Sequence, residues 1–347
     1  MFRWLLRRWF LAFLLVLIPG GLGLGASLGS TRVAALNDAL GPHAPTAIVI
    51  VILFLMSVTL DNGKLRAALG RPGPVLWASF VNMGLMPLLA WPLSRMQLSL
   101  DFTVGLVIAA CVPSTMAAAS VWTRKAGGND AVSLLVTLLT NSACFAITPL
   151  WLQLLMPPLG QGATEFRMDT GFLMQKLLVS ALLPIIAGQS ARLISRVAAF
   201  ADKHKIPLGV IAQGCILAMV FWESIKAGPQ ASSGALAGGV GAIALVWGSC
   251  IVLHLAGMAL AVAASRALQF ERMDRAAIAF AASQKTLPIG VYIAATFSAA
   301  GAPLAVLPML MYHASQLFVD TAVADQIAAA NRKADAAKNA LNDLTSS

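Results

Sequence analysis

The stretch CVPSTMAAASVWTRKAGGND, residues 111–130, interrupts an apolar segment of the chain. It passes from the end of that segment through Pro113 and a run of small side chains into a basic, glycine-rich loop. Proline has no N–H and its ring clashes with the preceding turn, so it kinks or ends a helix. In a membrane, backbone groups freed by such a break must lie against protein or a water-filled cavity, because lipid cannot pair with them. If the chain spans a membrane, this stretch predicts a kinked or broken helix that lies against protein or a water-filled cavity.

The composition indicates that the chain does span a membrane. Of its 347 residues, 59% are hydrophobic and 11% are charged, whereas soluble domains carry ~25% charged residues. A helix needs roughly 20 apolar residues to cross ~30 Å of hydrocarbon. Ten such stretches can be read, so we predict an all-α polytopic membrane protein with ten transmembrane helices. They cover residues 9–29, 44–60, 74–94, 102–122, 131–156, 171–191, 206–225, 235–264, 275–299 and 302–324.

The distribution of Lys and Arg orients these spans, because basic residues in short loops stay on the cytoplasmic side of the membrane. Of the 24 basic residues, 18 fall in the N-terminus, the tail and the loops after predicted spans 2, 4, 6 and 8. Only 4 fall in the opposite loops. We therefore expect a multi-pass protein of the cell (inner) membrane with both termini cytoplasmic.

Several function classes find no support in the sequence. The net charge of +10 does not indicate a nucleic-acid partner, because the basic residues are dispersed and form no continuous stripe. No serine–histidine pair, HExxH motif or nucleotide-binding loop stands out, so we expect neither an enzyme nor a cofactor. His254 and His313 lie singly inside spans, which favours hydrogen-bonded structural roles. The cysteines lie inside spans without CxxC spacing, which predicts packing roles for Cys111, Cys144, Cys215 and Cys250.

The spans divide into five and five, so the second half must enter the membrane from the opposite side. Similar halves would then be inverted repeats. We predict a first repeat at 1–158, a second repeat at 159–325 and a short polar cytoplasmic tail at 326–347.

The fourth span of the second half carries a matching break, SQKTLP at 283–288. Two half-helix ends near the middle of the membrane would offer partial charges to ions or to an anionic substrate. Ordinary proline kinks are the alternative, but two breaks at corresponding positions, each beside polar side chains, favour a transport site. The predicted substrate-binding residues are Pro113, Ser114, Thr115, Lys285 and Pro288.

Other polar residues inside the spans add to this prediction. An ionisable residue deep in a span is expensive, so Lys285 is a functional candidate by default. It would pair with an anionic substrate group or a carboxylate, or exchange a proton; a structural ion pair or snorkelling is the alternative. Asp320 receives no partner from the sequence. Ser133, Thr137 and Asn141 are four residues apart and share one helical face, where their oxygens suit either an alkali cation or interhelical hydrogen bonds.

The segment CVPSTMAAASVWTRKAGGNDAVSLLVTLLTNSACFAITPLWLQLL, residues 111–155, resembles the signature region of the bile acid:sodium symporter superfamily. In that region Cys-x-Pro precedes a broken helix, a basic-Gly-Asn turn and a span with spaced Ser and Thr. MSVTLDNGKLRAAL (56–69) and FVNMGLMPLLAW (80–91) match in kind and order, and WTRKAGGND and ASQKTLPIG resemble the divergent sodium/bile acid symporter-like branch. The resemblance extends to about residue 325. It implies two inverted five-span repeats, with spans 4 and 9 broken and crossing in a core domain and with spans 1, 2, 6 and 7 forming a panel domain.

The resemblance also implies two sodium sites. At the first, Ser120 stands at the family's Asn position and Ala119 at its Ser position, while Ser133 and Thr137 match the spaced pair of span 5. Na⁺ is thus the coupling ion that the resemblance implies.

At the second site, Asn82 stands for a glutamine of span 3 and Gln284 for the last residue of a Glu-x-x-x-Gln stretch, with Ser283 beside it. Phe280 occupies the position of the family's glutamate, and Lys285 follows Gln284. Na⁺ beside an ammonium without a compensating carboxylate is unfavourable at low dielectric. Either another residue supplies the negative charge or the coupling ion is not sodium.

The functional hypothesis is a secondary active transporter of a small, anionic organic solute that works by alternating access, with sodium coupling if the ion sites function. A proton-coupled or uncoupled carrier is one alternative, and a non-transporting membrane receptor or regulatory protein on the same fold is another. The expected partners are the solute and the lipid bilayer, without nucleic acid. The sequence specifies neither the substrate nor the oligomeric state.

Overall fold

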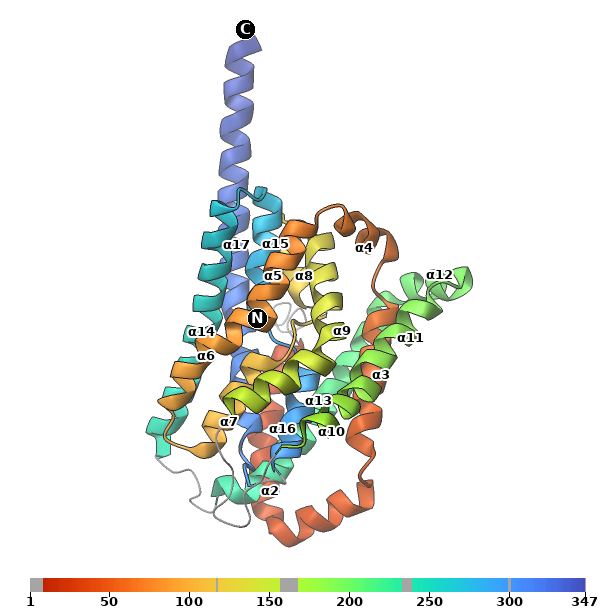
Figure 1. The fold of residues 1–347 in the computed structure, drawn as a ribbon, viewed down its shortest axis with the longest axis vertical. Helices are drawn as coiled ribbons and strands as arrows, with labels where there is room; N and C mark the ends of the chain where they lie inside the picture. The colour runs from red at the N-terminus through yellow and green to blue at the C-terminus, as the bar shows by residue number, and fades with distance from the viewer. Residues whose placement is uncertain (1–8, 117, 157–167, 233–238, 299–300, 347) are drawn as a thin grey trace.

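The computed structural model describes residues 9–116, 118–156, 168–232, 239–298 and 301–346, and all of their regular structure is helical (Figure 1). The predicted all-α class is therefore confirmed. The basic N-terminus (1–8) and the first residues of the predicted span 235–264 lie outside the described residues.

Within these ranges, six helical segments are long and apolar enough to cross a membrane. A seventh is counted if α3 (Ala44–Val58) and α4 (Asn62–Leu69), which are bent by 73°, form one span. The chain is thus a polytopic membrane protein. The six are α2 (Trp9–Leu40), α5–η1–α6 (Pro72–Phe80, Val81–Leu85 and Met86–Arg95), α9 (Asp130–Leu155), α10–η3–α11 (Thr170–Leu177, Leu178–Leu182 and Leu183–Ala191), α13 (Lys205–Ser232) and α14 (Gly239–Ala267).

The predicted set of ten full spans is not confirmed, and the inverted repeat stays a prediction. Two predicted spans are pairs of short helices: α7 (Leu100–Cys111) with α8 (Ala118–Lys125), and α15 (Arg272–Ser283) with α16 (Leu287–Ser298). At 1.5 Å per residue, none of these pieces covers the hydrocarbon alone. The helix of the tenth predicted span, α17 (Val306–Ser346), continues without a break through the predicted tail and extends beyond the helical bundle (Figure 1).

The first predicted span ends where the structure places a kink. Gly29 has φ 74° and ψ 165°, a positive φ that glycine adopts without steric cost. The chain then resumes a helix that runs to Leu40. The predicted boundary at residue 29 therefore marks a bend between two helical pieces rather than the end of the helix.

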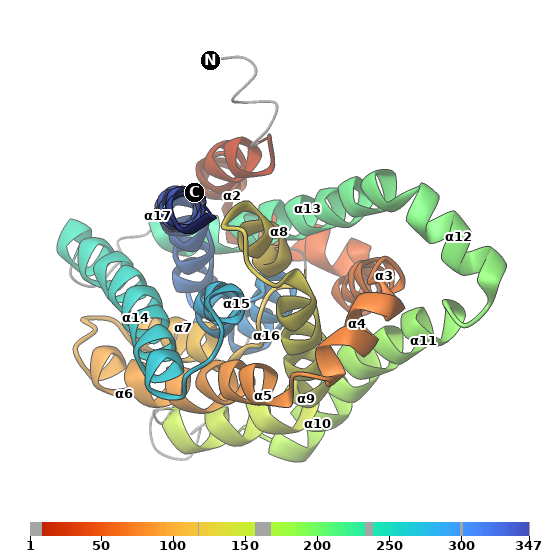
Figure 2. The ribbon, with the colours of Figure 1, turned by 90° about the horizontal axis from the view of Figure 1, so that it is seen from above.

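The short helices lie in the interior of the bundle. Seen from above, α8, α15 and α16 occupy the middle, with α13 along one side and with α5 and α6 along the opposite side (Figure 2). α13 packs along α2 and also contacts α16, while α15 contacts α5, α8 and α14. The two breaks are therefore enclosed by longer helices.

Ion pairs join loops at one end of the bundle. Asp130, at the start of α9, pairs with Lys64 of α4 at 2.7 Å and with Arg124 of α8 at 3.2 Å. Lys125 pairs with Asp325 of α17 at 2.7 Å. α4 and α8 lie toward the end of the molecule from which α17 projects (Figure 1). Loops with predicted cytoplasmic basic residues thus meet on one side.

Candidate functional site

The first break begins where α7 ends at Cys111. Val112 is extended (φ −75°, ψ 156°), as expected for a residue that precedes proline. The carbonyl oxygen of Cys111 no longer belongs to a continuing helix, and it accepts a hydrogen bond from the hydroxyl of Thr148 at 2.8 Å. The helical path resumes with α8 at Ala118. The break predicted from Pro113 is confirmed.

The second break has the same form. α15 ends at Ser283, Gln284 is extended (φ −71°, ψ 148°), and α16 begins at Leu287. Pro288 lies in the first turn of α16, where a missing N–H leaves no helical hydrogen bond unmade. The side chain of Gln316 pairs both freed backbone groups of Lys285: Oε1 accepts from its N–H at 2.9 Å, and Nε2 donates to its carbonyl at 3.0 Å.

The two breaks contact each other. The backbone N–H of Thr286 donates to the carbonyl oxygen of Pro113 at 2.8 Å. On the far side of the first break, Asn141 Nδ2 of α9 donates to the carbonyl oxygen of Ser114 at 2.7 Å. Backbone groups that lipid could not pair are thus paired inside the protein.

The amine of Lys285 is held by backbone oxygens. The residue is completely buried, and its Nζ donates to the carbonyl of Asn82 at 2.6 Å and to that of Val112 at 2.9 Å. Among the ion pairs of the described residues, none joins Lys285 to a carboxylate. The ammonium therefore bridges the first break and the segment that contains Asn82.

Asn82 lies in η1, a π-helical turn inside the third predicted span. Pro87 follows this turn and has no N–H to offer to the carbonyl four residues earlier, which favours a local change of helical pitch. The amide nitrogen of Asn82 donates to three carbonyls at the end of α15, those of Ala281, Ala282 and Gln284, at 3.3, 3.1 and 2.9 Å. Asn82 thus caps the C-terminal end of α15.

Asp320, which the sequence left without a partner, has two. Its carboxylate accepts from Gln284 Nε2 and lies 2.8 Å from His254 Nε2. The other ring nitrogen of His254 lies 3.2 Å from the carbonyl of Ser283, which also accepts from the hydroxyl of Tyr312 at 2.7 Å. The predicted hydrogen bonding of His254 is confirmed.

Sequence reasoning missed Gln316 and the pairing of Asp320. His313, Gln316 and Asp320 are three and four residues apart on α17, so they share one helical face. Polar residues on one face of a membrane helix usually mark an interior or functional surface. This spacing was a signal available in the sequence, although the partners on other helices were not.

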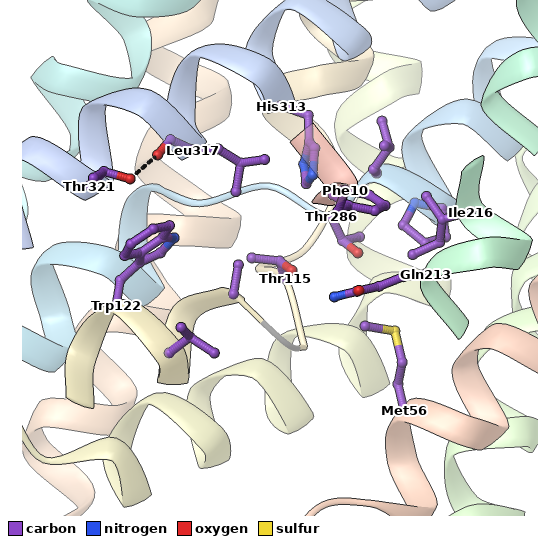
Figure 3. Close-up of a pocket in the computed structure, with 14 residues that line it drawn as sticks. Phe10, Met56, Thr115, Trp122, Gln213, Ile216, Thr286, His313, Leu317 and Thr321 are labelled. Carbon is purple, nitrogen blue, oxygen red and sulfur yellow. Dashed lines mark hydrogen bonds between the residues drawn. The ribbon is translucent and has the colours of Figure 1, made fainter. Parts of the chain in front are cut away.

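A cavity of about 220 Å³ lies between the breaks and the neighbouring helices. Thr115 and Thr286, one from each break, and Gln213 from α13 project into the same space (Figure 3). Phe10 of α2 and Met56 of α3 close another side. The remaining lining residues are Ala118, Val121, Trp122, Ile216, Leu287, Pro288, His313, Leu317 and Thr321.

The cavity is mostly apolar but offers hydrogen-bond donors. Gln316 accepts with Oε1 from Lys285, so its Nε2 hydrogens go to the Lys285 carbonyl and to His313 Nδ1, 2.8 Å away. Nδ1 of His313 is then the acceptor, and the ring hydrogen lies on Nε2. Trp122 Nε1 has no hydrogen-bond partner within the described part of the chain. Among the described residues, those that line the cavity include no Asp, Glu, Lys or Arg.

A second cavity of about 150 Å³ adjoins the first and carries basic side chains. The two share Met56, Val121 and Gln213. Arg124 and Lys205 line the second cavity, and both belong to the loops predicted to be cytoplasmic. Ser120, a predicted ion-binding residue, also lines it.

The predicted substrate residues are distributed around the first cavity. Thr115 and Pro288 line it, whereas Pro113, Ser114 and Lys285 lie in the breaks but not among the lining residues. The substrate-binding roles of all five stay predictions.

The predicted sodium residues make hydrogen bonds within the protein. Ser133 lies 2.6 Å from the hydroxyl of Thr123, and Thr137 donates to the carbonyl of Leu134 at 2.9 Å. Ser283 donates to the carbonyl of Ala279 at 2.8 Å. A hydroxyl that donates can still accept or coordinate through its oxygen, so sodium binding at these residues stays a prediction.

The sequence model of the SBF-like CPA transporter family matches residues 8–329. A probable sodium/metabolite cotransporter, BASS4, chloroplastic, from Oryza sativa subsp. indica is 29% identical over 299 residues, which cover 78% of this chain and 66% of that protein. The putative symporter YfeH of Escherichia coli (strain K12) is 24% identical over 284 residues, 79% of this chain and 81% of its own. Sodium/bile acid cotransporter 7 of Xenopus tropicalis is 22% identical over 334 residues, 92% of each chain.

These matches confirm the resemblance described above. The chain spans slightly less than two thirds of the length of the rice relative, and most of the two other proteins. The family and these relatives are transporters or cotransporters, not enzymes.

Proposed function

This chain belongs to the SBF-like CPA transporter family, and on that premise we propose that it is a secondary transporter that carries a small organic anion by alternating access. The observation that carries the proposal is the position of the first cavity. One wall is made by the two breaks, through Thr115 and Thr286, and the opposite wall by α2, α3 and α13. A cavity bounded by two helical groups opens to alternate sides when one group moves against the other.

The size of the cavity supports a small solute. About 220 Å³ is less than the ~300–1,000 Å³ of sites for drug-sized ligands. Phe10, Trp122 and Ile216 would contact an apolar body, and the donors of Gln213 and His313 would contact acceptor oxygens.

The charge distribution supports an anion. α8 and α16 begin beside the cavity, at Ala118 and Leu287, and the N-terminal end of a helix carries a partial positive charge. Arg124 and Lys205 line the adjoining cavity, where they would attract an anion toward the first one.

The two broken segments are similar in form, which supports the predicted inverted repeat. α7 and α15 each contain 12 residues, and an extended residue follows each of them, Val112 or Gln284. We propose that they are the equivalent fourth spans of repeats 1–158 and 159–325.

We further propose an inner-membrane location with both termini cytoplasmic. Its support is that Lys64 of α4 and Arg124 of α8 both pair with Asp130, and that α4 and α8 lie toward the end of the molecule from which α17 projects (Figure 1). The relatives' names mention sodium, and comparing benzoate uptake in sodium and in choline medium tests whether Ser120, Ser133 and Thr137 couple sodium to transport.

The test uses carboxylates of increasing size as choline salts, so that sodium is not varied. Acetate, benzoate and cholate are added to the detergent-solubilised protein and the melting temperature is measured. A ligand at a hundredfold excess over Kd stabilises the folded state by about 2.7 kcal/mol. Benzoate should raise the melting temperature more than acetate or cholate, and radiolabelled benzoate should enter proteoliposomes.

Two variants on α13 provide the matched control. Ile216 lines the cavity, whereas Ile211 is 52% exposed on the same helix. Ile216→Trp should abolish stabilisation by benzoate and its uptake, and Ile211→Trp should retain both. If benzoate stabilises both variants equally and both take it up equally, the cavity is not the substrate site.

A further inference from the structure

Lys285 places a positive charge where two helices are interrupted. Val112 follows the last residue of α7, so its carbonyl is among those that a helix C-terminus leaves without an intrahelical partner. The C-terminal end of a helix also carries a partial negative charge. The second acceptor, the carbonyl of Asn82, lies in the π-helical turn η1. The carbonyl oxygens of Val112 and Asn82 thus face the same buried position, and two partly negative oxygens favour a cation there.

The backbone carbonyls around this point are paired by nitrogen donors of the chain, whereas Asn82 Oδ1 and Gln284 Oε1 have no hydrogen-bond partner among the described residues. The Asn82 amide nitrogen donates hydrogen bonds to the carbonyls of Ala281, Ala282 and Gln284 at the end of α15. The Lys285 amine donates hydrogen bonds to the carbonyls of Asn82 and Val112, at 2.6 and 2.9 Å. The backbone oxygens that could surround an exchangeable cation here are therefore bonded to nitrogen atoms.

A carboxylate lies in the hydrogen-bonded network beside Lys285, although none of the ion pairs among the described residues joins the two groups. A buried ammonium is costly unless it is paired, and the carboxylate linked to this break is Asp320, bonded to Gln284 Nε2 and to His254. The side-chain amide of Gln284, the residue before Lys285, thus links the second break to that carboxylate.

We propose that the amine of Lys285, as an ammonium, is a tethered cation that fills a monovalent-cation position between the two breaks. No exchangeable ion is then required at this position. The consequence for coupling rests on the proposed transport function: the carrier cycles without an ion bound between Asn82 and Val112. The position itself has an affinity for small monovalent cations, and this affinity appears when the lysine side chain is shortened.

The test is rescue of a shortened side chain by a free cation. Lys285→Ala leaves the two carbonyls and removes the amine, and Lys285→Met retains the bulk of the side chain without the charge. The melting temperature of each purified variant is measured in choline chloride, which is too large to enter, and in methylammonium chloride and sodium chloride at equal ionic strength. Lys285→Met is included so that the result does not depend on the folding of one variant.

Lys176→Ala is the matched control. Lys176 also lies inside a predicted span, but its amine donates to the hydroxyl of Thr296 at 2.9 Å and lies 4.4 Å from the ring centre of Tyr292. It contacts no backbone carbonyl of either break in the described structure.

Lys285→Ala should melt below the wild type in choline and recover by about 2–4 °C in methylammonium, with a concentration dependence that saturates. The wild type and Lys176→Ala should not gain this increment. Lys285→Met should be less responsive, because its side chain occupies the vacated space. If Lys285→Ala is as stable as the wild type in choline, or if neither small cation restores it, the tethered-cation role is wrong.

Uptake of benzoate by proteoliposomes separates this inference from the proposed function. In choline medium the wild type should transport, whereas Lys285→Ala should transport only with methylammonium or sodium present. The inference would be overturned if the wild type transports only in sodium, if Ser133→Ala abolishes that transport and if no small cation rescues Lys285→Ala. The proposed transport function would still stand in that case. Absence of uptake by the wild type in every medium would count against the transport proposal, while the melting data would still decide the role of Lys285.

Discussion

The N–H of Thr286 donates to the carbonyl oxygen of Pro113 at 2.8 Å, across 173 positions of the chain. This bond joins the centres of the two breaks, so neither break can separate from the other without leaving a buried backbone group unpaired. Lys285, next to Thr286, adds a bond to the carbonyl of Val112, next to Pro113. The two interrupted helices therefore form one unit that would move together.

Gln316 should be the side chain on which the geometry of the second break depends most. Replacing it by Leu removes the partner of both backbone groups of Lys285 and that of His313 Nδ1. Each buried polar group left unpaired costs about 1–3 kcal/mol, so Gln316→Leu should lower the melting temperature markedly. Gln175→Leu is the control, because Gln175 is exposed. Similar melting temperatures for the two variants would contradict the pairing role of Gln316.

The buried carboxylate of Asp274 should stabilise the loops more than the exposed carboxylate of Glu271. Both accept from Arg71, at 2.9 and 2.6 Å. Asp274 alone is buried, and it also accepts from Asn129 Nδ2 at 2.8 Å. Asp274→Ala leaves the amide of Asn129 without this acceptor, and we expect a loss of about 1–3 kcal/mol.

Glu271→Ala serves as the matched control, since its side chain is 63% exposed and exposed ion pairs contribute little. Thermal unfolding of both variants in the same detergent measures the difference. A larger loss for Glu271→Ala than for Asp274→Ala would show that the exposed pair holds the loop.

The breaks were predictable because proline acts locally. Pro113 and Pro288 restrict the chain within a residue or a turn of their own positions, and the polar residues around them stand out in apolar segments. The partners of Lys285 were not predictable in the same way. They are backbone carbonyls 203 and 173 residues away. Every residue has a backbone carbonyl, so the residue types at these positions do not indicate which carbonyl accepts.

The number of full spans was less predictable than the breaks. Hydropathy reads the 102–122 segment as one stretch, because the few polar residues of the break, Ser114 and Thr115, hardly lower its mean hydropathy. Whether such a stretch is one helix or two depends on which groups pair the freed backbone, and those groups include Thr148 and Gln316 on other helices. The extension of α17 to Ser346 has a local cause, since the tail is rich in alanine, the best helix former.

Asp320 should be among the most sensitive positions of the interior. Asp320→Ala removes the carboxylate that pairs with His254 and accepts from Gln284. His254 Nε2 and Gln284 Nε2 then lose this acceptor, and each buried polar group left unpaired costs about 1–3 kcal/mol. The expected result is a large fall in melting temperature.

The double variant Asp320→Ala/His254→Leu tests this reason directly. It removes both members of the pair, so it should be more stable than Asp320→Ala alone. If the double variant melts at a lower temperature, the effect of Asp320 does not arise from an unpaired His254.

The packing of α2 against α13 should tolerate no added side chain at Gly25. A Cβ at Gly25 would overlap the carbonyl oxygen of Ile225 on α13, whereas a Cβ at Gly23 would meet nothing within 4 Å. Small residues let membrane helices approach closely, and this contact holds the α2 and α13 wall of the cavity. Overpacking a tight interface costs about 1–3 kcal/mol or more, so Gly25→Ala should lower the melting temperature and weaken stabilisation by benzoate. Gly23→Ala on the same helix should change neither, and equal effects of the two alanines would attribute the loss to altered helix propensity rather than to the contact with Ile225.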